Sequence, residues 1–146
     1  MLRIPHNALV FVGDGKKALV LRNEGDAQLV NLKTERVFTD ANPATRDQGA
    51  DRPGRSFSSV GAGRSSVQQT DWHKIEEHRF AHEMAATLER IVRERGVQAL
   101  VVVAPPRALA DLRKAFHPDV KKKIIAAIDK DLTKHPIDQI EKHLAA

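Results

Sequence analysis

The first forty residues alternate between short apolar runs and turn sequences. An apolar run at 8–12 is followed by Gly13-Asp14-Gly15, and a second run at 18–21 is followed by turn residues at 23–26. A third, less regular run contains Leu29, Val30, Leu32, Val37 and Phe38. Because such short connections join neighbouring antiparallel strands, this pattern predicts a three-stranded antiparallel meander.

The pattern changes to a helical period after residue 71. Apolar residues recur at helical spacing up to about Arg95, namely Phe80, Ala81, Met84, Ala85, Leu88, Ile91 and Val92. We expect Asp71 to cap the start of this helix by accepting a hydrogen bond from a free backbone amide. Gly96 is expected to end it.

Strands and helices alternate in the rest of the chain. The apolar run at 99–104 predicts a strand buried on both faces of a sheet. Pro105-Pro106 then begins a second helix, whose inward residues are Leu109, Leu112 and Phe116. Residues 120–132 fit either a helix or a strand, and we favour a strand centred on 124–128. A final helix follows His135-Pro136 and carries Ile137, Ile140 and Leu144.

The resulting order of elements is β-β-β-loop-α-β-α-β-α. A meander followed by alternating helices and strands predicts an α/β domain with a five-stranded mixed sheet and helices on its faces. This order is that of the RNase H-like fold. With 146 residues, the chain is expected to form a single domain over residues 1–146.

Composition removes several classes of function. The chain has no Cys, which excludes disulfide scaffolds, thiolate zinc sites, iron–sulfur clusters and Cys nucleophiles. No apolar run approaches the roughly 20 residues that span a bilayer, and the N-terminal stretch does not resemble a signal peptide. We therefore expect a cytoplasmic protein without membrane insertion. The net charge of +5 permits an anionic partner, and it acts through local patches because there is no long basic tail.

A long loop at 40–71 interrupts the pattern of strands and helices. It is rich in Gly and Ser and poor in apolar residues, so we expect it to be mobile. Between residues 52 and 70 it holds three Arg and no acidic residue. Guanidinium groups, hydroxyls and an aromatic ring are the groups that contact phosphates and stack on unpaired bases. The predicted RNA-binding residues are Arg52, Arg55, Ser56, Phe57, Arg64 and Ser65. On composition alone, a solvated loop without a ligand is an equal alternative.

Candidate catalytic and metal sites are weaker. A nuclease of RNase H type needs three or four carboxylates around two metal ions. Asp14 ends the first strand, and Asp129 and Asp131 follow the fifth, but the fourth strand supplies none. His78 and His82 share a helix face without an HExxH motif or an evident third ligand, which favours a solvated helix surface. We therefore predict no catalytic residue, no metal site and no cofactor.

Several stretches carry a resemblance to a known family. They are Arg52-Pro53-Gly54-Arg55-Ser56-Phe57, Gly63-Arg64-Ser65-Ser66, Thr70-Asp71-Trp72-His73, and the segments 102–109 and 129–136. Over nearly the whole chain, the sequence resembles the bacterial host attachment proteins. That family is related to the middle domain of archaeo-eukaryotic release factors and Pelota, which implies an RNase H-like fold.

The resemblance implies a function in translation. In release factors the equivalent loop carries Gly-Gly-Gln and reaches the peptidyl-tRNA ester, whereas residues 61–64 here read Gly-Ala-Gly-Arg. The resemblance therefore implies a module that places a loop against RNA or a ribosome, and a binding role is favoured over an enzymatic one. Lys121, Lys122 and Lys123 are a candidate second phosphate contact. An RNA or peptidyl-tRNA hydrolase, and a protein-interaction module in host attachment or envelope regulation, are the alternatives.

Overall fold

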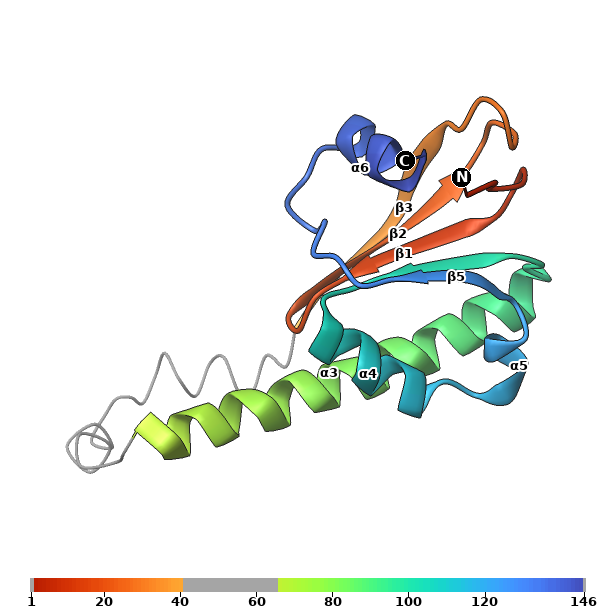
Figure 1. Cartoon of the computed structure of the whole chain (residues 1–146). Helices are drawn as coiled ribbons and strands as arrows, with labels where there is room; N and C mark the ends of the chain where they lie inside the picture. Colours follow the sequence, from red (N-terminus) through yellow and green to blue (C-terminus); the bar gives the residue numbers. More distant parts are fainter. Residues whose placement is uncertain (1, 41–65, 146) are drawn as a thin grey trace.

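The fold is built on a five-stranded mixed sheet. The computed structural model describes the backbone of residues 2–40 and 66–145, with side chains for 2–40 and 72–145. The spatial order of the strands is β3-β2-β1-β4-β5 (Figure 1). Their bounds are Leu9–Gly13 for β1, Lys17–Asn23 for β2, Leu32–Thr39 for β3, Leu100–Val103 for β4 and Ile124–Ile128 for β5.

The pairing of the strands matches the predicted topology. β1, β2 and β3 pair antiparallel in chain order, which confirms the meander. β4 pairs parallel with β1 on one side and parallel with β5 on the other. All four residues of β4 are buried, as expected for a strand inside a sheet that is covered on both faces.

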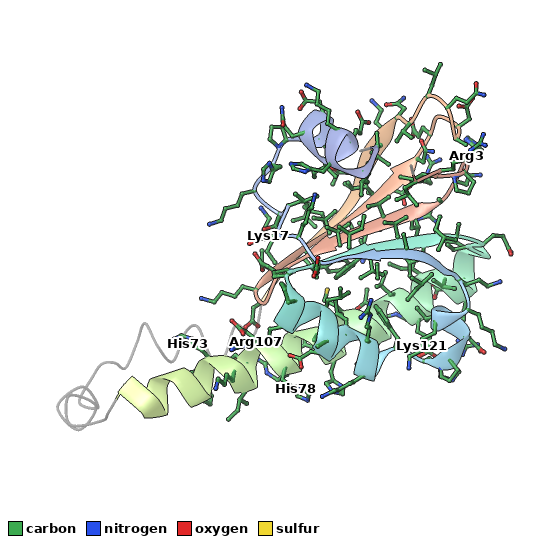
Figure 2. The ribbon with its side chains drawn as sticks, viewed as in Figure 1. Arg3, Lys17, His73, His78, Arg107 and Lys121 are labelled. Atoms are coloured by element: carbon green, nitrogen blue, oxygen red, sulfur yellow. The ribbon has the colours of Figure 1, made fainter. Side chains whose placement is uncertain are left out.

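Helices cover both faces of the sheet. One face packs against α3 (Ser66–Arg95), α4 (Pro106–Ala115) and the short α5 (Pro118–Lys121), and the other packs against α6 (Ile137–Ala145) (Figure 1). Apolar side chains fill the two layers between them (Figure 2). The α/β class, the mixed sheet and the strand at 124–128 are therefore confirmed, and α5 is an element that the sequence pattern did not reveal.

Two predicted boundaries are wrong. The helix begins at Ser66, so Asp71 lies inside α3 and is not its cap, and the last residues of the predicted loop at 40–71 are helical. Residues 66–71 contain no Gly or Pro to stop a helix, but too few apolar residues to show its period.

The third strand also starts later than predicted. It begins at Leu32, and Leu29 is 77% exposed in the preceding turn. Asp26 Oδ1 closes this turn by accepting hydrogen bonds from the amides of Gln28 and Leu29 at 2.9 and 2.7 Å. The side-chain hydrogen bonds of the turn therefore prevail over the β propensity of Leu29 and Val30.

The end of α3 was predicted correctly. Gly96 has a φ of 61°, in the left-handed region that favours glycine, and the Val97 amide donates to the Val92 carbonyl at 3.1 Å. These two features form the C-terminal cap in which a left-handed glycine turns the chain out of the helix.

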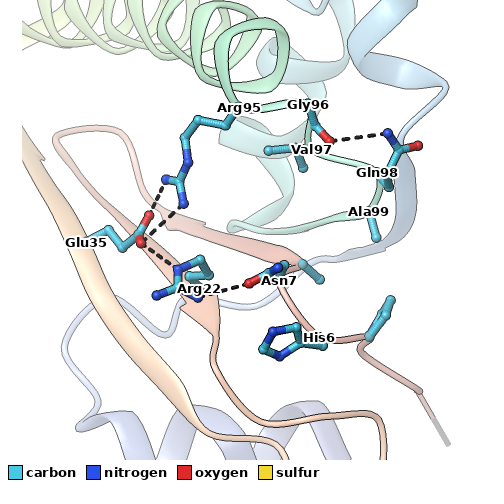
Figure 3. A pocket seen from close by; sticks show the side chains of 11 residues that line it. His6, Asn7, Arg22, Glu35, Arg95, Gly96, Val97, Gln98 and Ala99 are labelled. Atoms are coloured by element: carbon cyan, nitrogen blue, oxygen red, sulfur yellow. Dashed lines mark hydrogen bonds and ion pairs between the residues drawn. The ribbon is translucent and has the colours of Figure 1, made fainter.

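An ion-pair network joins this end of α3 to the edge strand β3. Arg95 and Arg22 both donate hydrogen bonds to the carboxylate of Glu35, the second at 2.7 Å (Figure 3). The network borders a pocket of about 480 Å³, which is also lined by His6, Asn7 and residues 96–99. Hydrogen bonding to Arg95 and then to Arg22 lowers the pKa of Glu35 below its ordinary value of 4.5, while burial opposes that shift.

We predict that Glu35→Gln destabilises the fold by up to about 1 kcal/mol at neutral pH, the range for solvent-accessible ion pairs. Because the folded-state pKa of Glu35 is lowered, its contribution is present above about pH 4.5 and is lost as the pH falls through the lowered pKa. Urea unfolding of both proteins from pH 7 to pH 3 measures this difference in the free energy of unfolding. Glu24→Gln, which removes only a pair with Arg22, is the control. A difference that persists unchanged at pH 3 would contradict the charge-based explanation.

Candidate functional site

Four of the five strands end at one edge of the sheet. β1, β4 and β5 are parallel, and β3 runs in the same direction because both β1 and β3 are antiparallel to β2. Val12 is in register with Val103, and Val103 with Ile128, so the residues that follow these strands lie at one level. The chain leaves β1 towards β2 and leaves β4 towards β5, on opposite sides. Such a switch point, at the carboxyl ends of the strands, is where α/β sheets commonly bind ligands.

Asp14 lies at the centre of this edge. Its Oδ1 accepts hydrogen bonds from the amides of Lys16 and Lys17, both at 2.7 Å, and its Oδ2 accepts one from Thr133 Oγ1 at 3.0 Å. Thr133 is only 3% exposed, and the same hydroxyl also lies 2.9 Å from Asp131 Oδ1. This cluster connects the β1–β2 turn to the segment that leads from β5 into α6.

A second polar cluster fixes the point where β3 ends. The amide of Asp40 donates to the Lys16 carbonyl at 2.7 Å, and the Asp40 carboxylate lies 3.5 Å from the Arg79 guanidinium. Arg79 also pairs with Glu76 and Glu83 along α3. The hydrogen bond to Glu76 is the main cause of a raised pKa at Arg79, which therefore keeps its charge.

α3 extends beyond the sheet at the same edge. Its buried residues begin at Phe80, while residues 72–79 are exposed or partly exposed (Figure 1). We call residues 72–79 the overhang. One of its side chains, Glu77, lies against Gly15 of the β1–β2 turn, so closely that a Cβ on that glycine would come within 2.7 Å of Glu77 Cγ. The overhang is thus held to the edge through the β1–β2 turn.

The predicted RNA-binding residues lie outside the described part of the chain. These are Arg52, Arg55, Ser56, Phe57, Arg64 and Ser65. Of the residues that flank their segment, Asp40 lies at the carboxyl edge, and α3 begins beyond that edge (Figure 1). The candidate second contact is elsewhere, because Lys121, Lys122 and Lys123 belong to α5 and the residues just before β5, at the opposite edge. Figure 2 shows Lys121 on the far side of the molecule from Lys17 and Arg107.

Several cationic side chains that the sequence analysis did not single out surround the carboxyl edge. They come from the β1–β2 turn, the start of α4 and the segment after β5, and they are Lys16, Lys17, Arg107, Lys130 and Lys134. No ion pair involves any of them within the described residues. Nothing in their spacing along the chain indicates that they share an edge, since strand register alone brings them there.

The edge brings two of the candidate metal ligands together. Asp14 and Asp131 meet at Thr133, but within residues 2–40 and 66–145 no three His, Asp or Glu side chains converge closely enough to hold a metal ion. The His78 and His82 rings are 4.5 Å apart, and His78 Nδ1 lies 3.7 Å from Asp111. A two-metal nuclease site needs more carboxylates than this edge provides in the part of the chain that is described.

We predict that Thr133→Val costs about 1–3 kcal/mol of stability, because the isosteric change removes a buried hydroxyl that lies within hydrogen-bond distance of two carboxylates. Chemical denaturation with circular dichroism measures the change in the free energy of unfolding. Thr34→Val is the matched control, since Thr34 is exposed on β3 and its substitution should stay within about 0.5 kcal/mol. Equal stability of the two variants would show that the cluster does not contribute to the fold.

A known protein family matches the chain over most of its length. None of the helices in the described ranges combines the length and the apolar character that a bilayer crossing requires. No match was found among curated proteins. The model of bacterial archaeo-eukaryotic release factor family 12 matches residues 7–144, from just before β1 into α6. The chain therefore belongs to bacterial archaeo-eukaryotic release factor family 12.

Proposed function

We propose that this chain is a translation-factor-like module that binds RNA or the ribosome through its Arg-rich loop. The observation that carries the proposal is the stretch at 52–70, which has three Arg and no acidic residue in a chain of a release-factor-related family. Arg52, Arg55 and Arg64 would contact phosphates, Phe57 would stack on a base, and Ser56 and Ser65 would donate hydrogen bonds.

The electrostatics of the carboxyl edge support an anionic partner on this side. Two of its acidic groups have partners, since Asp14 accepts from two amides and Thr133, and the Asp40 carboxylate lies 3.5 Å from the Arg79 guanidinium. The neighbouring cations Lys16, Lys130 and Lys134 are exposed. The five cations around the edge outnumber Asp14, Asp129 and Asp131, so the edge attracts a polyanion.

The loop sequence separates this role from peptide release. Release factors place a Gly-Gly-Gln in the equivalent loop, and this chain has Gly61-Ala62-Gly63-Arg64. We infer that the module has kept the placement of a loop against RNA without the residues for hydrolysing peptidyl-tRNA. A cytoplasmic location follows from this role, and an effect on host attachment would be an indirect consequence of altered translation.

We predict that replacing Arg52, Arg55 and Arg64 by Ala weakens RNA binding and its dependence on salt. Each lost phosphate contact on a single strand should reduce the slope of log affinity against log salt by about 0.7, so the triple variant should lose about two units. A salt titration of binding to a single-stranded oligoribonucleotide measures both quantities. Phe57→Ala should weaken binding with nearly the same slope, because stacking releases no counterions.

The opposite edge provides a control of equal charge. Lys121, Lys122 and Lys123 replaced by Ala also remove three positive charges, but from α5 and its neighbours at the far edge. This variant should keep both affinity and slope close to those of the wild type. If the Lys variant loses as much RNA affinity and salt slope as the Arg variant, binding reflects net charge alone. The assignment of the loop as the RNA-binding site is then wrong.

One observation favours a hydrolase as the second candidate. Asp14 and Asp131 share the Thr133 hydroxyl at the switch point of the sheet. Two carboxylates can activate a water in a hydrolytic reaction.

We predict that the protein has no magnesium-dependent cleavage activity on RNA or peptidyl-tRNA, because two carboxylates do not complete a two-metal site. Incubation of purified wild type and Asp14→Asn with labelled substrate tests this. Cleavage by the wild type that disappears in a folded Asp14→Asn protein would establish the hydrolase instead.

A further inference from the structure

We propose that β5 pairs antiparallel with the β5 strand of a second copy of this chain, across a two-fold axis near the middle of the strand. The order of the strands makes β3 and β5 the two outer strands of the sheet, and no described strand lies on the outer side of either (Figure 1). A strand that is paired on one side only leaves backbone N–H and C=O groups free on the other. The inference is independent of RNA binding, because it concerns how two copies of the sheet meet.

The two outer strands differ in the charge that they carry. β3 contains three charged residues, Lys33, Glu35 and Arg36. β5 reads Ile-Ile-Ala-Ala-Ile and contains none. Charged side chains and Pro keep the outer strands of soluble proteins from pairing with other chains. β5 has neither within its bounds, so of the two outer strands it is the one whose composition permits pairing.

A β-bulge in β5 leaves an apolar side chain exposed. Leu100 of β4 is in register with Ile124 and Val101 with Ala126, so Ile125 is the extra residue. Ile125 is 44% exposed and belongs to neither core cluster, whereas the other four residues of β5 pack against one or the other. A bulge that protects an outer strand commonly presents a polar residue, but this one presents a large aliphatic one. Its burial against a partner strand is favourable.

The charges that flank β5 favour an antiparallel pair. Three lysines at 121–123 precede the strand, and Asp129, Lys130 and Asp131 follow it. In an antiparallel pair, the residues before one strand face the residues after the other, so three lysines meet two carboxylates and one lysine at each end. In a parallel pair, lysines would face lysines. None of these six side chains forms an ion pair within the described residues, so their charges are available to a partner.

A second copy is the partner that these features fit. β5 has basic residues before it and carboxylates after it, so two identical strands complement each other when a two-fold axis relates them. The same pairing gives the lysines at 121–123 a role at a position remote from the carboxyl edge. Because the two strands run in opposite directions, the carboxyl edges of the two copies point apart and both stay accessible.

Sedimentation equilibrium of the full-length protein over about 1 µM to 1 mM tests the proposal. A pair of five-residue strands buries a small area, so we expect a weak, concentration-dependent dimer. Ile125→Lys places a charge on the strand and should weaken dimerisation about tenfold or more. A wild-type protein that stays monomeric over the whole range overturns the proposal.

Val37→Lys is the matched control on the other outer strand. Val37 is 56% exposed on β3, and its substitution introduces the same charge. This variant should dimerise within about twofold of the wild type, since β3 takes no part in the pair. Circular dichroism of both variants shows whether they are folded. If Val37→Lys weakens the dimer as much as Ile125→Lys, the pairing of β5 is wrong.

Charge exchange tests the antiparallel orientation. Asp129→Lys should weaken dimerisation about fivefold or more, because lysines then face lysines at both ends of the pair. Adding Lys122→Glu and Lys123→Glu to this variant exchanges the charges of the two flanks. The combined variant should dimerise within about threefold of the wild type. If it stays as weak as Asp129→Lys alone, the two strands do not meet in this orientation.

A thiol crosslink tests the contact without disrupting it. The chain has no Cys, so Ile125→Cys introduces its only thiol, close to the expected two-fold axis. A short bismaleimide should link two copies of this variant and should leave Val37→Cys, whose thiol is on β3, unlinked. This test decides the proposal even if Ile125→Lys does not fold. Linkage of Val37→Cys without linkage of Ile125→Cys would show that the copies meet elsewhere and would overturn it.

Discussion

The parallel pairing of β1 with β4 is the contact on which the rest of the structure depends. Residues 9–12 of β1 and 100–103 of β4 are buried on both faces, against α3 and α4 below and α6 above. Each such Val or Leu contributes about 1.5–3 kcal/mol by leaving water, so this pair contributes strongly to the stability of the sheet. Because the two strands are parallel, they also end at the same edge. The residues that follow the two strands, Asp14 after β1 and Pro105 after β4, are therefore placed at this edge by the pairing of the strands.

The two edges of the sheet differ in the hydrogen bonds and ion pairs that their polar side chains make. At the amino-terminal edge, Asn23 is fully buried and serves the backbone on both sides, donating to the Ile4 carbonyl at 2.8 Å and accepting from the amides of Gly25 and Asn31. Glu35 joins Arg22 and Arg95 there in one ion-pair network. At the carboxyl edge Asp14 accepts from two amides and from Thr133, Asp40 lies beside Arg79, and the lysines of the turns have no acidic partner in the described chain. The positive charge of the carboxyl edge thus comes from lysines that outnumber its carboxylates.

Sequence reasoning recovered the fold because the fold depends on periodic apolar residues and on Gly and Pro. The meander, the buried strand at 100–103, the strand at 124–128 and the stop at Gly96 all have such a local signal. Sequence reasoning placed the start of β3 wrongly because side-chain hydrogen bonds in the preceding turn keep Leu29 out of the strand. It placed the start of α3 wrongly because the helix continues as polar residues back to Ser66, far from the apolar residues that pack it against the sheet. The cluster of Asp14 with Thr133 joins residues 119 positions apart, and no spacing rule could have predicted it. The loop residues from Arg52 to Ser65, identified by composition and resemblance, lie outside the described structure, so their role stays a prediction.

α3 combines a half that is packed in the core with a half that projects past the sheet. Its second half, from Phe80 to Val92, is packed in the core and provides the nucleus that helix formation requires. Adding further turns to an existing helix costs little, so the polar residues from Ser66 to Arg79 remain helical over about 20 Å without a core of their own. Arg79 reinforces the junction by pairing with Glu76, Glu83 and Asp40 at once. Because the outer face of the overhang makes no contact with either core cluster, residues such as Trp72 can change without altering the packing of the sheet. Substitutions on this face therefore cost little folding stability, as long as the ion pairs of Arg79 are kept.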